Sequence, residues 1–88
     1  MTPPQNFLTS WPIYLRRSVL VKIADIYLHL QEWQKVIEFC NQALFIARKI
    51  DNKNLITSSL HILGQSYQKL DQYHKAIDFW FLRRFYGN

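Results

Sequence analysis

Apolar residues recur at steps of three and four along most of this chain, which is the spacing of one face of an α-helix. A first helix is predicted to run to about Leu30, with Ser10 as its N-cap and Pro12 tolerated in its first turn. Three more helices are predicted over about 33–49, 55–70 and 73–85. The side chains predicted to face inward are, helix by helix, Leu20, Ile23, Ala24, Tyr27 and Leu30; Val36, Cys40, Ala43, Leu44 and Ala47; Leu60, Leu63, Gly64 and Tyr67; and Ala76, Ile77 and Trp80.

Short polar segments separate these helices. Residues 31–32 and 71–72 are predicted to form tight turns, and residues 51–54 a linker in which an Asp or Asn caps the third helix. Gly87 is predicted to stop the fourth helix. Connections this short make successive helices antiparallel neighbours. The pattern therefore predicts an all-α fold.

Two stretches of the chain match each other when one is shifted by 40 residues. The identical pairs are Leu20/Leu60, Tyr27/Tyr67, Leu30/Leu70, Lys35/Lys75, Ile37/Ile77, Phe39/Phe79 and Phe45/Phe85. Near-matches include Ala24 with Gly64 and Trp33 with Tyr73. A period of this length is typical of stacked helical repeats, which usually form binding surfaces rather than catalytic pockets.

The second unit carries a recognisable series, Leu60-x-x-Leu63-Gly64-x-x-Tyr67 followed by Tyr73-x-x-Ala76-x-x-x-Trp80. It resembles the tetratricopeptide repeat in its form of about 40 residues. The first unit is weaker, with Ala24 in place of the glycine and Cys40 in place of the aromatic residue. Over about residues 17–82, the resemblance implies two stacked antiparallel helix hairpins. Small residues are expected to meet where the helices cross, Ala24 against Val36 and Gly64 against Ala76.

The domain boundaries follow from the same resemblance. A flexible segment, 1–9, is expected before a single domain, 10–88, made of repeat one (about 17–56) and repeat two (about 57–88). At the end of the second unit Arg83 and Arg84 stand where the first unit has Ala43 and Leu44, so a following helix is not expected to dock in the usual way. The chain is then either a terminal repeat with a polar cap or what is left of a longer array.

The residues offer little for catalysis. Three histidines, His29, His61 and His74, have no metal-binding spacing, and no glycine-rich phosphate loop is present. The single cysteine, Cys40, excludes an internal disulfide, and helical spacing places no base beside it. We therefore expect no enzymatic activity, no metal and no cofactor. No signal peptide or membrane span is predicted, and a cytoplasmic location is expected.

The net charge of +5 comes from eleven basic and six acidic residues, with the basic ones dispersed in pairs. Arg16, Arg17, Lys22 and Lys69 would give a mildly basic concave surface. A basic helical nucleic-acid-binding protein is therefore the alternative class. No aromatic residue is interleaved with these charges as base stacking requires, so nucleic acid is the less favoured partner.

In tetratricopeptide proteins the first helix of each pair lines a concave groove, and the resemblance implies a groove that binds another protein or a peptide. Asp25 and Gln65 occupy the positions where some members use Asn to clamp a terminal carboxylate, so that mode of recognition is not supported. The groove residues implied are Ser18, Val21, Lys22, Asp25, Leu28 and His29 in the first unit, and Ser58, His61, Ile62, Gln65, Gln68 and Lys69 in the second.

The fourth predicted helix is apolar nearly all round. An outer helix at the end of a stack cannot bury all of its large side chains, and leaving several in water is unfavourable. Self-association into a homo-oligomer is the preferred explanation; a partner protein, or the N-terminal Phe7, Leu8 and Trp11 folded back, are the alternatives. The predicted self-association surface consists of Phe79, Trp80, Phe81, Leu82, Phe85 and Tyr86.

Overall fold

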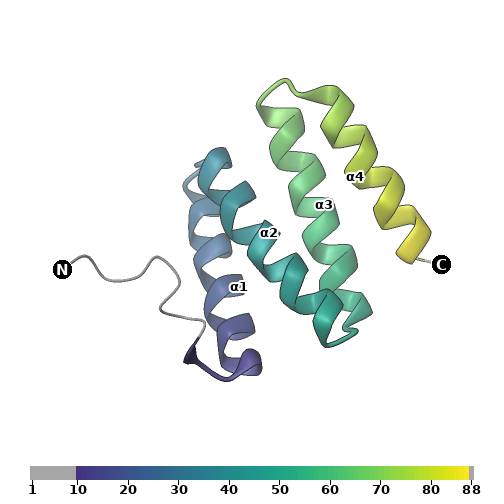
Figure 1. The fold of residues 1–88 in the computed structure, drawn as a ribbon. Helices are drawn as coiled ribbons and strands as arrows, with labels where there is room; N and C mark the ends of the chain where they lie inside the picture. Colours follow the sequence, from purple (N-terminus) through teal and green to yellow (C-terminus); the bar gives the residue numbers. More distant parts are fainter. Residues whose placement is uncertain (1–9, 88) are drawn as a thin grey trace.

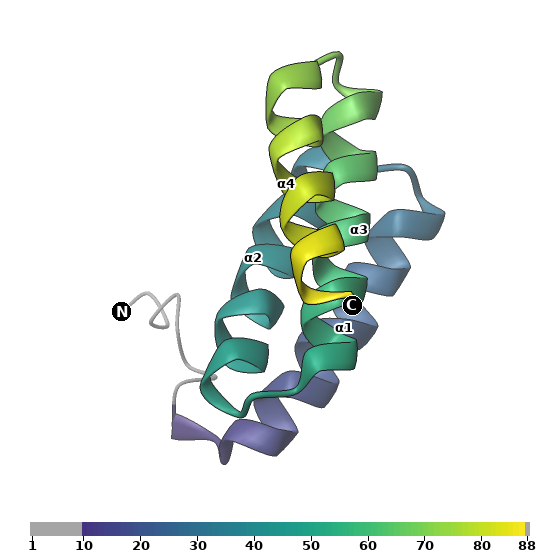
Figure 2. The ribbon, with the colours of Figure 1, turned by 90° about the vertical axis from the view of Figure 1, so that its right-hand side faces the viewer.

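The computed structural model describes residues 10–87, so the prediction for residues 1–9 lies outside the described residues. It contains four helices, α1 (Ile13–His29), α2 (Trp33–Lys49), α3 (Lys53–Lys69) and α4 (Tyr73–Tyr86), and no strand within that range. Each helix runs antiparallel to the one before it (Figure 1). Seen from the side, α1 and α3 form one layer and α2 and α4 the other (Figure 2). The predicted all-α fold of stacked hairpins is confirmed.

The two predicted N-caps have different outcomes. Pro12, not Ser10, is the N-cap residue of α1, because the extended ψ of 143° at Pro12 makes the helix begin after it. The N–H groups of Leu15 and Arg16 both donate to the Pro12 carbonyl, each at 3.0 Å. In α3 the predicted Asx cap is confirmed, since Asn52 Oδ1 accepts the Leu55 N–H at 3.1 Å. The cap starts α3 at residue 53, two positions earlier than predicted.

A residue with left-handed backbone lies in each of the three turns: Gln31 (φ 58°), Asp51 (φ 53°) and Asp71 (φ 60°). The next N–H then donates to a carbonyl five positions back, at 3.0 Å from Glu32 to Tyr27 and at 2.8 Å from Gln72 to Tyr67. This is the Schellman arrangement, which satisfies the last free carbonyls of a helix. The first and third turns are 40 residues apart, so the repeat extends to backbone geometry.

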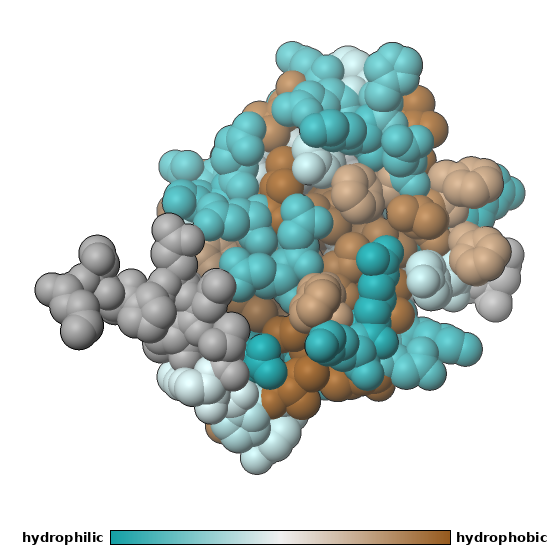
Figure 3. All heavy atoms as spheres, viewed as in Figure 1, coloured by the Kyte–Doolittle hydropathy of each residue, from teal (hydrophilic) through white to brown (hydrophobic). Residues whose placement is uncertain are grey.

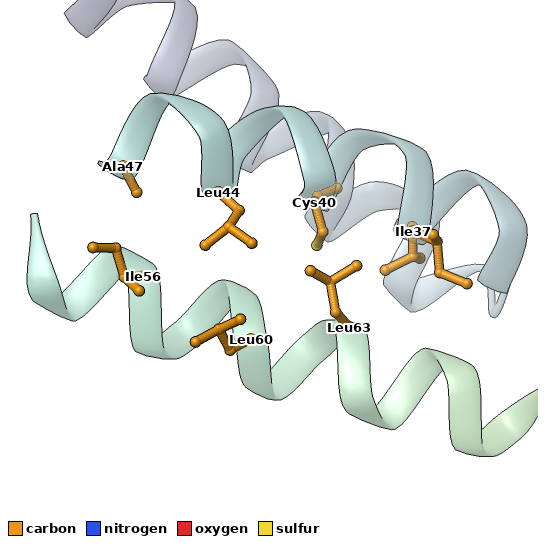
Figure 4. Close-up of a cluster of buried hydrophobic side chains, with 9 residues drawn as sticks. Ile37, Cys40, Leu44, Ala47, Ile56, Leu60 and Leu63 are labelled. Carbon is orange, nitrogen blue, oxygen red and sulfur yellow. The ribbon is translucent and has the colours of Figure 1, made fainter. Parts of the chain in front are cut away.

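The core lies mainly between α2 and α3. Figure 4 shows the side chains of α2 pointing at those of α3, with Leu44 facing Leu60 and Ala47 facing Ile56. The predicted inward residues of α2 are all buried, as are Leu20, Ala24, Leu60, Leu63 and Ala76. Burying a large aliphatic side chain stabilises the fold by about 1.5–3 kcal/mol, so this interface contributes substantially to the stability of the fold.

Two residues predicted to face inward are exposed instead. Leu30 is the C-cap residue of α1 and lies one position beyond the helix. Ile77 on α4 is 59% exposed, whereas its repeat counterpart Ile37 is only 7% exposed. The difference arises because α3 covers Ile37, while no helix in the described part of the chain covers this face of α4.

Aromatic pairs hold each hairpin in the same way. Tyr27 stacks on Phe39 with ring centroids 5.6 Å apart, and Tyr67 stacks on Phe79 at 5.4 Å. The interplanar angles are 11° and 5°, so both pairs are nearly parallel. Because the two pairs are related by the 40-residue shift, the two hairpins are packed by the same aromatic contact.

The crossing of α3 and α4 differs from the expectation. Ala76 is fully buried, but the atoms nearest to a Cβ built on Gly64 belong to the indole of Trp80, not to Ala76. The glycine thus makes room for a large ring one turn further along α4. The predicted close packing at Gly64 is confirmed, and its nearest neighbour is Trp80, while the predicted partner Ala76 is buried one turn earlier on α4.

Candidate binding groove

A hollow of about 330 Å³ lies between the two helices of one layer, α1 and α3. Four of the predicted groove residues line it: Ser18, Val21, Lys22 and Asp25. The remaining lining residues are Arg17 of α1 and, at the start of α3, Asn52 and Leu55. We call this hollow the α1–α3 groove.

A second hollow of about 380 Å³ lies at the C-terminal end of α1 and shares Lys22 and Asp25 with the groove. His29 lines it as predicted, and Ile26 and Leu30 are additions. These two apolar side chains are exposed, which gives the second hollow a mostly apolar wall. Lys22 and Asp25, three residues apart on α1, therefore lie at the junction of two depressions.

The groove residues of the first unit differ in how firmly they are held. The Ser18 hydroxyl donates to the Tyr14 carbonyl at 3.3 Å. His29 Nδ1 lies 2.8 Å from the Asp25 carbonyl oxygen. Because a carbonyl can only accept, Nδ1 carries the proton in this bond, and Nε2 is the acceptor of the neutral ring. The imidazole is thereby fixed on the last turn of α1.

The predicted residues of the second unit do not line either hollow. Ser58, His61, Gln68 and Lys69 are exposed, and Gln65 is half-buried. Leu28 and Ile62 pack against the core and act as support for the groove helices rather than as its surface. Lys69 Nζ lies 6.0 Å from the ring centroid of Trp33, so this cation is directed toward α2.

Sequence reasoning missed Asn52 and Leu55. Asn52 was predicted only as a possible helix cap, and that bond does hold its side chain at the edge of the groove. A helical period gives no signal for a residue such as Asn52, which is placed by a turn. The Asn52 cap at the start of α3 is the one feature that could have pointed to them.

The charges of the α1–α3 groove are two basic and one acidic, from Arg17, Lys22 and Asp25. Val21 and Leu55 add apolar surface beside them. A ligand that fits this lining presents a carboxylate next to an apolar side chain, which is peptide chemistry. No aromatic side chain lines this hollow, so bases have nothing to stack on.

The single cysteine, Cys40, is unreactive where it lies. Cys40 is buried between α2 and α3, and this burial, with a smaller effect from the charge of Asp25, raises the pKa of its thiol to about 12. The thiol is therefore protonated at neutral pH, and the thiolate is the reactive form. Within residues 10–87, no three His, Cys, Asp or Glu side chains are grouped as metal ligands would be.

The predicted self-association residues of α4 fall into two groups. Phe79, Trp80 and Tyr86 are half-buried and pack inward, Phe79 on Tyr67 and Trp80 on Gly64. Leu82, Phe81 and Phe85 are exposed. Figure 3 shows apolar residues gathered over the middle of the α2–α4 side and reaching its α4 edge.

No helix among the described residues has the length and apolar character needed to cross a bilayer. A model of the tetratricopeptide repeat family matches residues 15–79, which include α1 from its third residue, α2, α3 and half of α4. No curated protein and no solved structure matches the chain. The matched region contains every residue of both hollows on the α1 side, whereas Arg83 and Arg84 lie beyond it.

Proposed function

The chain belongs to the tetratricopeptide repeat family, and from this premise we propose that its α1–α3 groove binds a peptide segment of a partner protein. Proteins of this family generally act as protein-interaction modules and are typically non-catalytic scaffolds. The proposal therefore concerns where this chain binds and what chemistry it selects.

The observation that carries the proposal is the position of Lys22 and Asp25 at the junction of two hollows. One hollow supplies Arg17 as a second cation, and the other supplies the apolar Ile26 and Leu30. An extended segment crossing the junction would place a carboxylate near Arg17 and Lys22 and an apolar side chain near the end of α1. We propose an acidic and apolar peptide as the ligand, with no chemical step carried out on it.

A selection from a displayed library of random peptides, made on the full chain, tests this proposal. Selected peptides are expected to combine acidic and apolar residues and to lose at least ten-fold in affinity for the double variant Lys22→Ala, Asp25→Ala. The matched control is Lys35→Ala, Glu38→Ala, which removes an exposed lysine and an exposed acidic residue three positions apart on α2. The Nζ and Oε2 atoms of this pair lie 3.7 Å apart. Equal losses of affinity in both variants, or a selection that yields no peptide, would refute the proposal that the groove binds a peptide.

A separate binding measurement with an oligonucleotide tests the nucleic-acid alternative. Phosphate contacts give a steep fall in affinity with rising salt, because bound counterions are released. A single-stranded oligonucleotide that bound the chain with such a slope, and was weakened by Lys22→Ala, would favour the alternative. The lining of the groove argues against it, since no aromatic side chain is there for a base to stack on.

We also propose that the chain self-associates through the exposed apolar residues of α4. Leu82, Phe81 and Phe85 support this proposal because large apolar side chains on one helix are an unfavourable surface to leave in water. Sedimentation of the full chain over a wide concentration range tests it, and a monomer at every concentration would refute it.

A further inference from the structure

We infer that two copies of this chain pair through α4 in a closed two-fold contact, and that they do not continue the helical stack head to tail. This inference rests on the proposed self-association and specifies its geometry. It starts from an apolar ridge along α4 at steps of four residues, made of side chains that are 55–74% exposed: Tyr73, Ile77, Phe81 and Phe85.

The interface between α2 and α3 shows what a continued stack would require. Ile37, Cys40, Leu44 and Ala47 of α2 face α3 in Figure 4, and the 40-residue shift maps them onto Ile77, Trp80, Arg84 and Gly87. All four counterparts line a hollow of about 830 Å³ on α4, with Thr57, Phe81 and Arg83 completing it. This hollow is therefore the place where the next helix of a stack would lie.

In a head-to-tail stack that helix would be α1 of the next copy, because α1 corresponds to α3. Ile56 of α3, which faces Ala47, corresponds to Arg16 of α1. By the same shift Arg84 would face Leu20 and Gly87 would face Arg16, so Arg16 of one copy would lie one helical turn from Arg84 of the other. Like charges placed together at an interface are strongly unfavourable, so the chain's own residues oppose this arrangement.

A two-fold contact avoids the clash. Side chains four residues apart form a ridge, and two such ridges interlock when helices cross at about −50°. In an antiparallel pair the Arg84 end of one α4 lies beside the Tyr73 end of the other, and the two Arg84 side chains are separated by roughly 16 Å at 1.5 Å per residue. That separation exceeds the screening length of about 8–10 Å at physiological salt.

The two ends of α4 are also complementary in charge. The Tyr73 hydroxyl donates to Asp71 Oδ1 at 3.0 Å, so a carboxylate and an exposed ring lie together at the start of the helix. Arg84 of the second copy can pair with that carboxylate and cover that ring. A ridge of four such side chains buries on the order of 400 Å² per copy, against about 800 Å² in a standard stable interface. The dimer is therefore expected to be weak, with a dissociation constant in the micromolar range or above.

Sedimentation equilibrium of the full chain, from low micromolar to near-millimolar concentration, is the first test. The expected result is a reversible monomer–dimer equilibrium that stops at two copies. Phe81→Ser is expected to raise the dissociation constant at least ten-fold. Phe45→Ser, which removes an exposed ring from α2 (60% exposed, against 71% for Phe81), is the matched control and should leave the dissociation constant unchanged.

Arg84→Asp separates the two geometries because one predicts weaker and the other stronger association between copies of the chain. In the two-fold pair it removes the partner of Asp71 and weakens the dimer, whereas in a head-to-tail stack it turns repulsion by Arg16 into attraction. Single-cysteine crosslinking gives an independent answer. In an equimolar mixture, Ile77→Cys and Phe81→Cys are expected to form the mixed disulfide-linked dimer under mild oxidation in preference to either homodimer, because the antiparallel pair places these two positions opposite each other. The wild-type chain is not expected to form a disulfide-linked dimer, because Cys40 is buried.

Growth beyond two copies, together with tighter association of Arg84→Asp, would overturn the inference in favour of a head-to-tail stack. A dimer in which Ile77→Cys and Phe81→Cys form no mixed disulfide would overturn the inference and leave self-association standing. A monomer at every concentration would overturn both, while the peptide selection on the α1–α3 groove would still stand or fall separately.

Discussion

The indole of Trp80 lies against Gly64, so that a Cβ built on the glycine would lie 2.9 Å from Cε2 of the ring. The repeat counterparts of these residues are Cys40 and Ala24. In repeat two a glycine on one helix therefore accompanies a tryptophan on the next. In repeat one the same two places hold an alanine and a cysteine. At this crossing the indole ring therefore limits the size of the residue that faces it.

Gly64→Ala is expected to destabilise the fold by about 1–3 kcal/mol through overlap with Trp80, although alanine favours a helix by about 1 kcal/mol over glycine. Urea denaturation followed by far-UV circular dichroism measures the difference. In the background of Trp80→Cys, which copies the residue of repeat one, Gly64→Ala should cost less, because the ring that it overlaps has been removed. An increase in stability for Gly64→Ala alone would contradict the packing described here.

Ile37→Ala and Ile77→Ala form a matched pair, since they make the same change at equivalent positions of the two repeats. Ile37 is covered by α3, so its truncation should cost about 2–4 kcal/mol. Ile77 is exposed, and its truncation should cost under about 0.5 kcal/mol in dilute, monomeric solution. Thermal or urea unfolding distinguishes the two, and similar losses would mean that α4 is covered in the monomer.

Gln31→Gly should stabilise the fold by about 0.5–1 kcal/mol, because Gln31 holds a φ of 58° that glycine adopts without a steric penalty. Gln42→Gly, at an exposed position in the middle of α2, is the control and should lose about 1 kcal/mol. The comparison uses the free energy of unfolding. A loss at both positions would show that the turn gains nothing from the change.

Stability should fall at alkaline pH because of Cys40. The pKa of its thiol rises from 9.0 to about 12 on burial, so above pH 9 the unfolded chain loses this proton while the folded chain keeps it. The free energy of unfolding is unaffected by this thiol below pH 9, falls by about 1.4 kcal/mol per pH unit above it, and stops falling near pH 12, where the folded chain also loses the proton. Urea unfolding at several values of pH measures the slope. Cys40→Ala should show a shallower slope than wild type, and parallel slopes would contradict the prediction.

Periodicity and turn chemistry account for most of what the sequence predicts about this fold. All four helices lie where steps of three and four place them, and the inward residues of α2 are buried. Errors occur where a helix has no neighbour or comes to an end, at Ile77 and Leu30. A helical period assigns each residue an angle around its own helix, and it does not say whether another helix lies there.

The binding surface was predicted less completely for the same reason. Lys22 and Asp25 of the first unit lie together in the α1–α3 groove. His61 and Gln68 of the second unit do not reach it, because the spacing between helices decides which residues share a hollow. Asn52 enters through its turn, which no pattern of apolar residues describes.

Within residues 10–87 the helices pack in chain order, α1 on α2, α2 on α3 and α3 on α4. Unfolding can therefore begin at either end without disturbing the other, as in a one-dimensional array. Amide hydrogen exchange should be slowest along α2 and α3 and faster in the two terminal helices. Since α1 forms one wall of the groove, any ligand bound there would also slow exchange at that end of the molecule.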